Sequence, residues 1–136
     1  MRTRMLGVLA VVAVLAAVLA STADATRPRH PCSKRYTRYL VDVVSLSATV
    51  YSPGCGGAAL MAGDIDSHAT SIFPRSLPKR YVVIAHGTNR AGDPRAIYRC
   101  AISDRSVKTR DGYYRQTTAL CRNVKGDSFK YVFDMA

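Results

Sequence analysis

The spacing of apolar and polar positions changes once along the chain, near residue 80. Over residues 36–50 apolar side chains recur every three or four positions, with Arg38, Asp42 and Ser45 on the other side. This spacing predicts a helix that stops at Pro53-Gly54, although the many β-branched residues leave a strand open. From residue 54 to residue 78, glycine and proline predict irregular turns.

From residue 81 onward the period is two. Four short segments rich in Val, Ile, Tyr or Thr predict antiparallel strands at residues 81–85, 96–102, 113–120 and 129–133. A helix followed by strands predicts an α+β fold, with one N-terminal helix packed on an antiparallel sheet of about four to five strands. In the second segment, alternation directs Tyr98, Cys100 and Ile102 into the core. It directs Arg95 and Arg99 away from the core.

The N-terminus has the pattern of a secretory signal peptide. Arg2 and Arg4 precede an apolar run over residues 5–20, and Ala23-Asp24-Ala25 fits a small-residue cleavage site. The run is shorter than the ~20 residues that a transmembrane helix needs, and no second apolar run follows it. We therefore expect a signal peptide over residues 1–25, and a single secreted, monomeric domain over residues 26–136 without a transmembrane segment.

The exported part is strongly basic. Because Arg2, Arg4 and Asp24 precede the expected cleavage site, residues 26–136 keep 18 of the 20 Lys and Arg residues, 8 of the 9 acidic residues and a formal charge of +10. A charge of this size favours acidic partners such as RNA, anionic lipid or cell-wall polymers. The cations are dispersed, so the chain has no basic tail.

All four cysteines, Cys32, Cys55, Cys100 and Cys121, lie in the exported part. An even number in a secreted chain predicts two disulfides, and the sequence alone allows three pairings. No cysteine or histidine pair has the spacing of zinc ligands, so we expect neither a metal nor another cofactor.

His86 follows the first predicted strand and is the one candidate catalytic residue. A histidine at a strand end is commonly a surface or capping residue. Together with His68 and a carboxylate such as Asp93 or Asp111, however, it could form a proton-transfer site.

The order of these segments resembles the small secreted microbial ribonucleases, which include the bacterial barnase-type and the fungal guanyl-specific enzymes. The resemblance covers residues 32–121 and is carried by the stretches SLP, YVVI, a glycine loop, an arginine directly before AIY, and KTRDGYYRQTTALC. In that family an early cysteine is often joined to one near the end of the sheet. The resemblance therefore implies the pairs Cys32–Cys121 and Cys55–Cys100.

The resemblance also implies where the reacting groups would lie. Such enzymes use a glutamate as base, a histidine as acid and an arginine that binds the phosphate, and the matching positions hold Arg80, Gly112 and Arg95. Arginine stays protonated and glycine has no side chain, so both proton-transfer groups are missing. What remains is a cradle for phosphate or RNA, expected to consist of Arg80, Arg90, Arg95, Arg99 and Arg110. Lys130, far along the chain, is expected to lie outside it.

Three functions are compatible with these features. The first is a non-catalytic ribonuclease-like effector that binds RNA or a host protein, similar to those that fungal pathogens secrete. The second is an active secreted ribonuclease with a relocated site at His86. The third is a cationic antimicrobial or toxin-like protein that acts on membranes or walls, but no basic amphipathic helix supports it. We expect the first.

Overall fold

The computed structural model describes residues 27–86 and 92–135. The expected signal peptide and Arg90 therefore lie outside the described residues.

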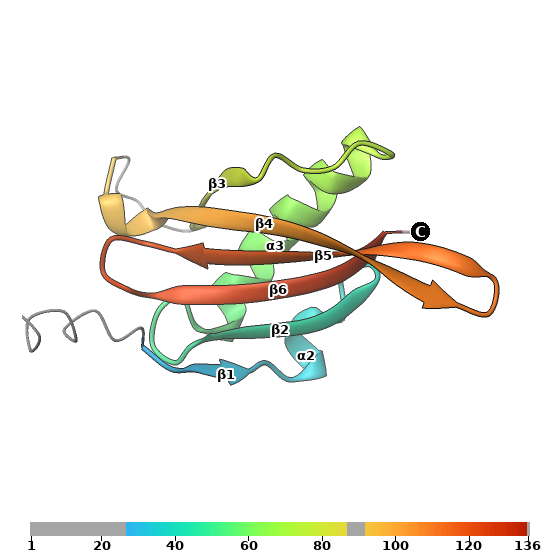
Figure 1. The fold of residues 1–136 in the computed structure, drawn as a ribbon. Helices are drawn as coiled ribbons and strands as arrows, with labels where there is room; N and C mark the ends of the chain where they lie inside the picture. The colour runs from blue at the N-terminus through green and yellow to red at the C-terminus, as the bar shows by residue number, and fades with distance from the viewer. Residues whose placement is uncertain (1–26, 87–91, 136) are drawn as a thin grey trace, which may run out of the picture.

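Within these residues the chain forms one six-stranded antiparallel sheet with a long helix on one side (Figure 1). The strands run in chain order as β1 (Arg29–Pro31), β2 (Val43–Thr49), β3 (Arg80–Ile84), β4 (Ile97–Thr109), β5 (Gly112–Arg122) and β6 (Ser128–Met135). The helices are α2 (Lys34–Thr37), α3 (Gly54–Ile72) and a 3-10 helix (Pro94–Ala96). Across the sheet the strand order is β1-β2-β6-β5-β4-β3.

The predicted fold class is wrong: the sheet has six strands instead of four to five, and the long helix lies in mid-chain instead of before the strands. The second half of the segment expected to be a helix is β2, which pairs with β1 on one side and β6 on the other. The strand alternative for this segment is therefore correct from residue 43 onward, and only the four residues of α2 are helical before it. This segment forms a strand and not a helix because it pairs with a strand on each side. Its β-branched side chains also suit the pleated surface of a sheet.

The long helix α3 occupies the segment expected to be irregular. Its buried residues Ala58, Met61, Ala62, Ile65 and Ala69 recur at helical spacing, so the pattern was present in the sequence. Glycines at positions 56, 57 and 63 obscured it, because glycine in a helix interior costs about 1 kcal/mol relative to alanine. Within the described residues no helix is both long and apolar enough to cross a membrane.

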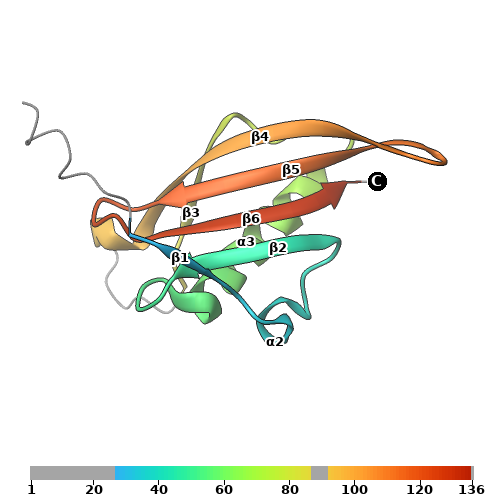
Figure 2. The same cartoon turned by 60° about the horizontal axis from the view of Figure 1, so that its bottom comes forward.

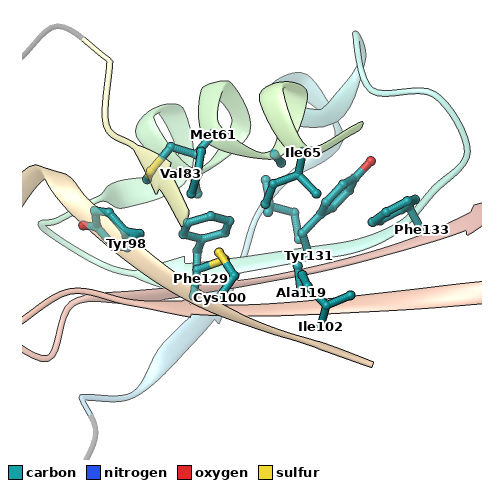
Figure 3. Packing of buried hydrophobic residues seen from close by; sticks show 14 of the residues in the cluster. Met61, Ile65, Val83, Tyr98, Cys100, Ile102, Ala119, Phe129, Tyr131 and Phe133 are labelled. Carbon is teal, nitrogen blue, oxygen red and sulfur yellow. A yellow bond between two sulfur atoms is a disulfide. The ribbon is translucent and has the colours of Figure 1, made fainter. Parts of the chain in front are cut away.

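The second half of the chain matches its prediction. All four expected strands are present, and Tyr98, Cys100 and Ile102 point into the core while Arg99 is exposed. Figure 3 shows Tyr98, Cys100 and Ile102 in one cluster with Met61 and Ile65 of α3 and the aromatic rings of β6. The hydrophobic core therefore lies between α3 and one side of the sheet.

The disulfide pairing that the ribonuclease resemblance implied is wrong. All four predicted cysteines do form disulfides, but the pairs are Cys32–Cys55 and Cys100–Cys121. Cys100 and Cys121 stand directly opposite each other on β4 and β5. Cys32 lies just before α2 and is joined to the first turn of α3. Each disulfide therefore fastens neighbouring elements, and neither joins the start of the domain to the end of the sheet.

The hairpin formed by β4 and β5 is longer than the rest of the sheet. Its strands pair from Arg99–Arg122 to Thr109–Gly112, and its tip extends past the other strands (Figures 1 and 2). Gly112 at the turn has a φ of 135°, which favours glycine. No described helix or strand covers the side of the sheet that faces away from α3. Gln116, Ser128 and Val132 are nevertheless buried there, whereas the basic side chains that β3 to β6 carry on that side are exposed.

Candidate polyanion-binding face of the sheet

The uncovered side of the sheet carries basic side chains on four neighbouring strands. We call it the outer face and define it by the solvent-accessible residues of two adjacent rows across β3 to β6, all of which point away from α3: Arg80, Val82, Arg99, Ala101, Leu120, Arg122 and Lys130. All four cations among them are exposed. They are brought together from positions up to 50 residues apart because antiparallel pairing sets opposite residues on the same side of a sheet.

The register arranges the outer face in two rows that run across the strands. In one row Arg80, Ala101, Leu120 and Lys130 are successive partners, so the cations stand at both ends. In the next row Val82, Arg99, Arg122 and Ser128 are partners, so the cations stand at the centre. With strands about 4.8 Å apart, this pattern spreads positive charge over an area of roughly 15 Å across the sheet.

Arg99 and Arg122 are the closest cations in this pattern. Directly opposite residues in an antiparallel pair have Cβ atoms about 4.5–5.5 Å apart, and like charges in that position destabilise the sheet. The ion pairs of the described residues, Arg27–Asp127 and His86–Asp64, involve neither arginine. Each guanidinium is exposed and offers five donors in a planar fork, which suits a phosphate.

A shallow hollow of about 290 Å³ lies beside these two arginines. It is lined by Pro94, Ile97, Arg99, Arg122, Asn123 and Val124. The Asn123 side chain is already occupied, because its amide donates to the Arg95 carbonyl at 2.9 Å and its oxygen accepts from backbone N–H groups. The two guanidinium groups are therefore the polar groups that this hollow offers to a ligand.

The structure brings together only part of the predicted cradle. Arg80 and Arg99 both lie on the outer face. Arg95 lies in the 3-10 helix at the start of β4, where its N–H group donates to Asp93 Oδ1 at 2.9 Å. The strand alternation that directed Arg95 to the same side as Arg99 does not extend to this helix. Arg90 is outside the described residues.

Arg110 does not belong to the cradle, because it lies in the turn at the tip of the β4–β5 hairpin. β4 has 13 residues, which at about 3.3 Å per residue separate Arg110 from the other end of the strand by roughly 40 Å. The same distance separates Arg95 from Gly112, the position that matches the histidine of the ribonucleases. The three positions taken from the resemblance therefore do not surround one phosphate.

Sequence reasoning missed Arg122 and misplaced Lys130. Both lie on the outer face. Lys130 is opposite Leu120, Leu120 is opposite Ala101, and Ala101 is opposite Arg80, so Lys130 and Arg80 share one row. The expectation that Lys130 lies outside the cradle is wrong, because distance along the chain says little about distance in a meandering sheet. The sequence offered only a partial signal for Arg122: Asp111-Gly112 marks a hairpin here, but it favours a turn one residue later than the Arg110-Asp111 turn that sets Arg99 opposite Arg122.

His86 and His68 lie on the other side of the sheet, near α3. His86 Nε2 is 2.5 Å from Asp64 Oδ2, and both side chains are about half exposed, at 46% and 47%. The ring of His68, one helical turn after Asp64, stacks on Tyr81 with centroids 5.4 Å apart. Burial, and then the negative charge of Asp64, raise the pKa of Tyr81.

This arrangement connects β3 to α3. The carboxylate that accompanies His86 is Asp64, so the expectation of Asp93 or Asp111 is wrong: Asp93 caps the 3-10 helix and Asp111 lies at the hairpin tip. The described residues contain no group of three His, Cys or acidic side chains that could hold a metal ion. The cations that could hold a phosphate are on the opposite side of the sheet, so His86 and His68 do not share a site with them.

Asp66 of α3 forms a second polar contact on the core side. The hydroxyl group of the fully buried Tyr131 donates to Asp66 Oδ1 at 3.2 Å. Burial raises the pKa of Asp66, an effect that the nearby Asp42 charge increases and the hydrogen bond from Tyr131 opposes. Burial and the Asp66 charge also raise the pKa of Tyr131. Asp66 and Tyr131 lie on the side of the sheet that packs on α3, so we infer that their contact stabilises the fold.

Asp66→Asn is expected to change how stability depends on pH. A carboxyl group whose pKa is raised by folding binds more protons in the folded state than in the unfolded chain. Its contribution to the free energy of unfolding therefore decreases as pH rises from about 4 through the raised value. Asparagine cannot ionise, but its oxygen can still accept from Tyr131.

Urea titrations at pH 4 and pH 7 measure this effect. The stability of Asp66→Asn relative to the wild type should increase from pH 4 to pH 7. A difference that stays constant, or that changes in the opposite direction, would contradict the raised pKa.

In comparisons with known proteins, no protein-family model, no curated protein and no solved structure matches the chain.

Proposed function

We propose that the protein is a secreted, non-catalytic binding protein for single-stranded RNA, which it contacts through the outer face. The observation that carries this proposal is the placement of Arg99 directly opposite Arg122, beside a hollow and without a carboxylate partner among the described residues. A sheet retains two opposed like charges at a cost, and a phosphate bridging them would offset that cost.

The proposal does not depend on the ribonuclease resemblance. The cysteine pairing implied by that resemblance is wrong, and the positions of Arg80, Arg95 and Gly112 do not converge. Export is supported by the N-terminal apolar run and by the two disulfides, which persist in oxidising compartments. An action on a host, as an effector, is the biological setting that the resemblance suggests for this binding.

The chemistry of the outer face predicts weak sequence preference. Its cations can contact phosphates, which position a nucleic acid without reading its bases. The other defining residues are Val82, Ala101 and Leu120, so none of the seven has an aromatic ring to stack on a base. We therefore expect similar affinities for single-stranded RNAs of different sequence and a strong dependence on salt.

Affinity for a short single-stranded RNA, measured against salt concentration, tests the proposal. Arg99→Ala should weaken binding and lower the salt slope by about 0.7, the value for one phosphate contact to a single strand. Arg110→Ala is the matched control, because it removes the same charge at the remote tip of the hairpin. Equal losses for the two variants would show that net charge alone attracts RNA, and a host protein would then be the better partner.

RNA cleavage in the same samples tests the non-catalytic part of the proposal. His86 and His68 lie on the opposite side of the sheet from the outer-face cations, so neither of them faces a phosphate bound at Arg99 and Arg122. We expect intact RNA after long incubation at neutral pH. Turnover that His86→Ala abolishes would contradict this and would support a ribonuclease with a site at His86 and Asp64.

A further inference from the structure

A second basic surface lies away from the outer face, in the segment from α2 to the start of β2. This segment, residues 34–44, has the sequence KRYTRYLVDVV, and we call it the α2 patch. Figure 2 shows α2 at the edge of the molecule, on a segment that extends away from the sheet. The Cys32–Cys55 disulfide fixes Cys32, two residues before α2, to the first turn of α3, so the start of the patch is covalently attached to α3.

The α2 patch exposes an unusual amount of apolar surface. Tyr39 is 79% exposed, Val41 62% and Val44 51%, although such side chains are usually buried. These three residues lie within six positions of one another, interrupted by Asp42 and by the partly buried Leu40 and Val43, so the exposed apolar side chains are clustered in one short segment. Such a patch on a protein surface marks a contact with another apolar phase or a partner.

Cations surround this apolar surface. Lys34, Arg35 and Arg38 lie in or directly after α2 and are exposed, and Asp42 is the one acidic residue of the patch. The guanidinium of Arg35 lies 4.6 Å from the ring centre of Tyr36, and that of Arg38 lies 4.5 Å from the ring centre of Tyr39. Each arginine is thus held beside a tyrosine with its charge accessible.

A hollow of about 420 Å³ opens between α2 and β2. Its lining includes the apolar side chains of Val43, Val44 and Leu46 and the cations Lys34 and Arg38. A lining that combines apolar and cationic side chains suits a ligand that has an anionic head and an apolar body. Tyrosine beside exposed aliphatic and basic side chains is the composition typical of a membrane interface.

We propose that the α2 patch binds the surface of a bilayer that contains anionic lipid. Tyr39, Val41 and Val44 enter the boundary between headgroups and acyl chains, while Lys34, Arg35 and Arg38 contact the headgroups. RNA is the less suitable occupant, because aliphatic side chains do not stack on bases and the Tyr36 and Tyr39 rings already carry a guanidinium on one face. This surface is independent of the outer face.

Fluorescence offers a direct test, because the chain contains no tryptophan. Tyr39→Trp places a single indole in the patch, and Tyr113→Trp places one at the hairpin tip, where the native tyrosine is 72% exposed. With vesicles containing phosphatidylserine, we expect a blue shift of the Tyr39→Trp emission and quenching by brominated acyl chains. Tyr113→Trp should show neither change, and pure phosphatidylcholine vesicles should affect neither variant.

Vesicle sedimentation separates the contribution of charge. Arg38→Ala should reduce partitioning onto anionic vesicles about fivefold, since one cation near an anionic surface contributes about 1 kcal/mol. Arg110→Ala and Arg122→Glu should leave it within about twofold, since neither residue belongs to the patch.

Three results would overturn the proposal. The first is no emission change for Tyr39→Trp, and the second is an equal change for Tyr113→Trp. The third is a blue shift of Tyr39→Trp with single-stranded RNA that matches the shift with vesicles, which would assign the patch to RNA.

Discussion

Arg122→Glu is expected to weaken RNA binding about 10- to 100-fold while it increases the stability of the folded protein. The loss of affinity follows from removing a charge-assisted contact to phosphate, worth about 1.5–3 kcal/mol, and from pairing the new carboxylate with Arg99. The gain in stability follows because an opposite-charge pair replaces two like charges directly opposite each other, a change worth about 0.2–1 kcal/mol. Because the two expected effects have opposite signs, a general loss of folding could not account for the loss of affinity.

Arg110→Glu is the matched control for this prediction. It makes the same change in net charge at the hairpin turn, where no described cation stands directly opposite. RNA affinity is measured at fixed ionic strength, and stability by denaturant unfolding. If both variants lose affinity equally and neither gains stability, Arg99 and Arg122 are not a binding pair, and the proposed function fails.

Phe129→Ala is expected to lower the free energy of unfolding by about 3–5 kcal/mol. Phe129 is fully buried on β6, and its ring centre lies 5.7 Å from that of Tyr98 (Figure 3). Its partner on β5 is the disulfide-bonded Cys121, and its partner on β2 is Ala48. The neighbouring side chains are therefore fixed by pairing or by a covalent bond, so they cannot move to fill the cavity left by the ring.

Guanidinium chloride unfolding with the disulfides intact measures this loss. Tyr113→Ala serves as control, because this tyrosine is 72% exposed at the hairpin tip and its loss should change stability by less than about 0.5 kcal/mol. A loss below about 1 kcal/mol for Phe129→Ala would show that the core does not lie between α3 and β6. The side assigned to the outer face would then also be in question.

The candidate site was only partly predictable from the sequence. Arg99 was expected to point outward, and this is confirmed because side-chain direction follows from a period of two within one strand. Arg122 was missed because its relation to Arg99 depends on the turn that joins β4 and β5. Placing that turn at Arg110-Asp111 would also have set Cys100 opposite Cys121 and corrected the disulfide pairing.

The helix shows a different limit of sequence reasoning. The pattern of residues 36–50 satisfied a helical spacing, and the glycines of residues 54–72 argued against one, yet the structure has the reverse assignment. The free energy that decides such cases comes from burial against other elements. Small residues such as Ala58 and Ala62 let α3 pack closely on the sheet, which offsets the low helix propensity of its glycines.

The sequence by itself determined the features that depend on near neighbours: the strands of the second half, the inward and outward sides of β4, the excess of positive charge and the presence of two disulfides. Alternation and composition are local properties, so one strand suffices to read them. Only the tertiary structure decided which strands are adjacent, which cysteines pair and which cations share the outer face. These depend on the order β1-β2-β6-β5-β4-β3, in which the last strand pairs with the one before the helix. That order is set by the burial of side chains distant in sequence, which no local pattern records.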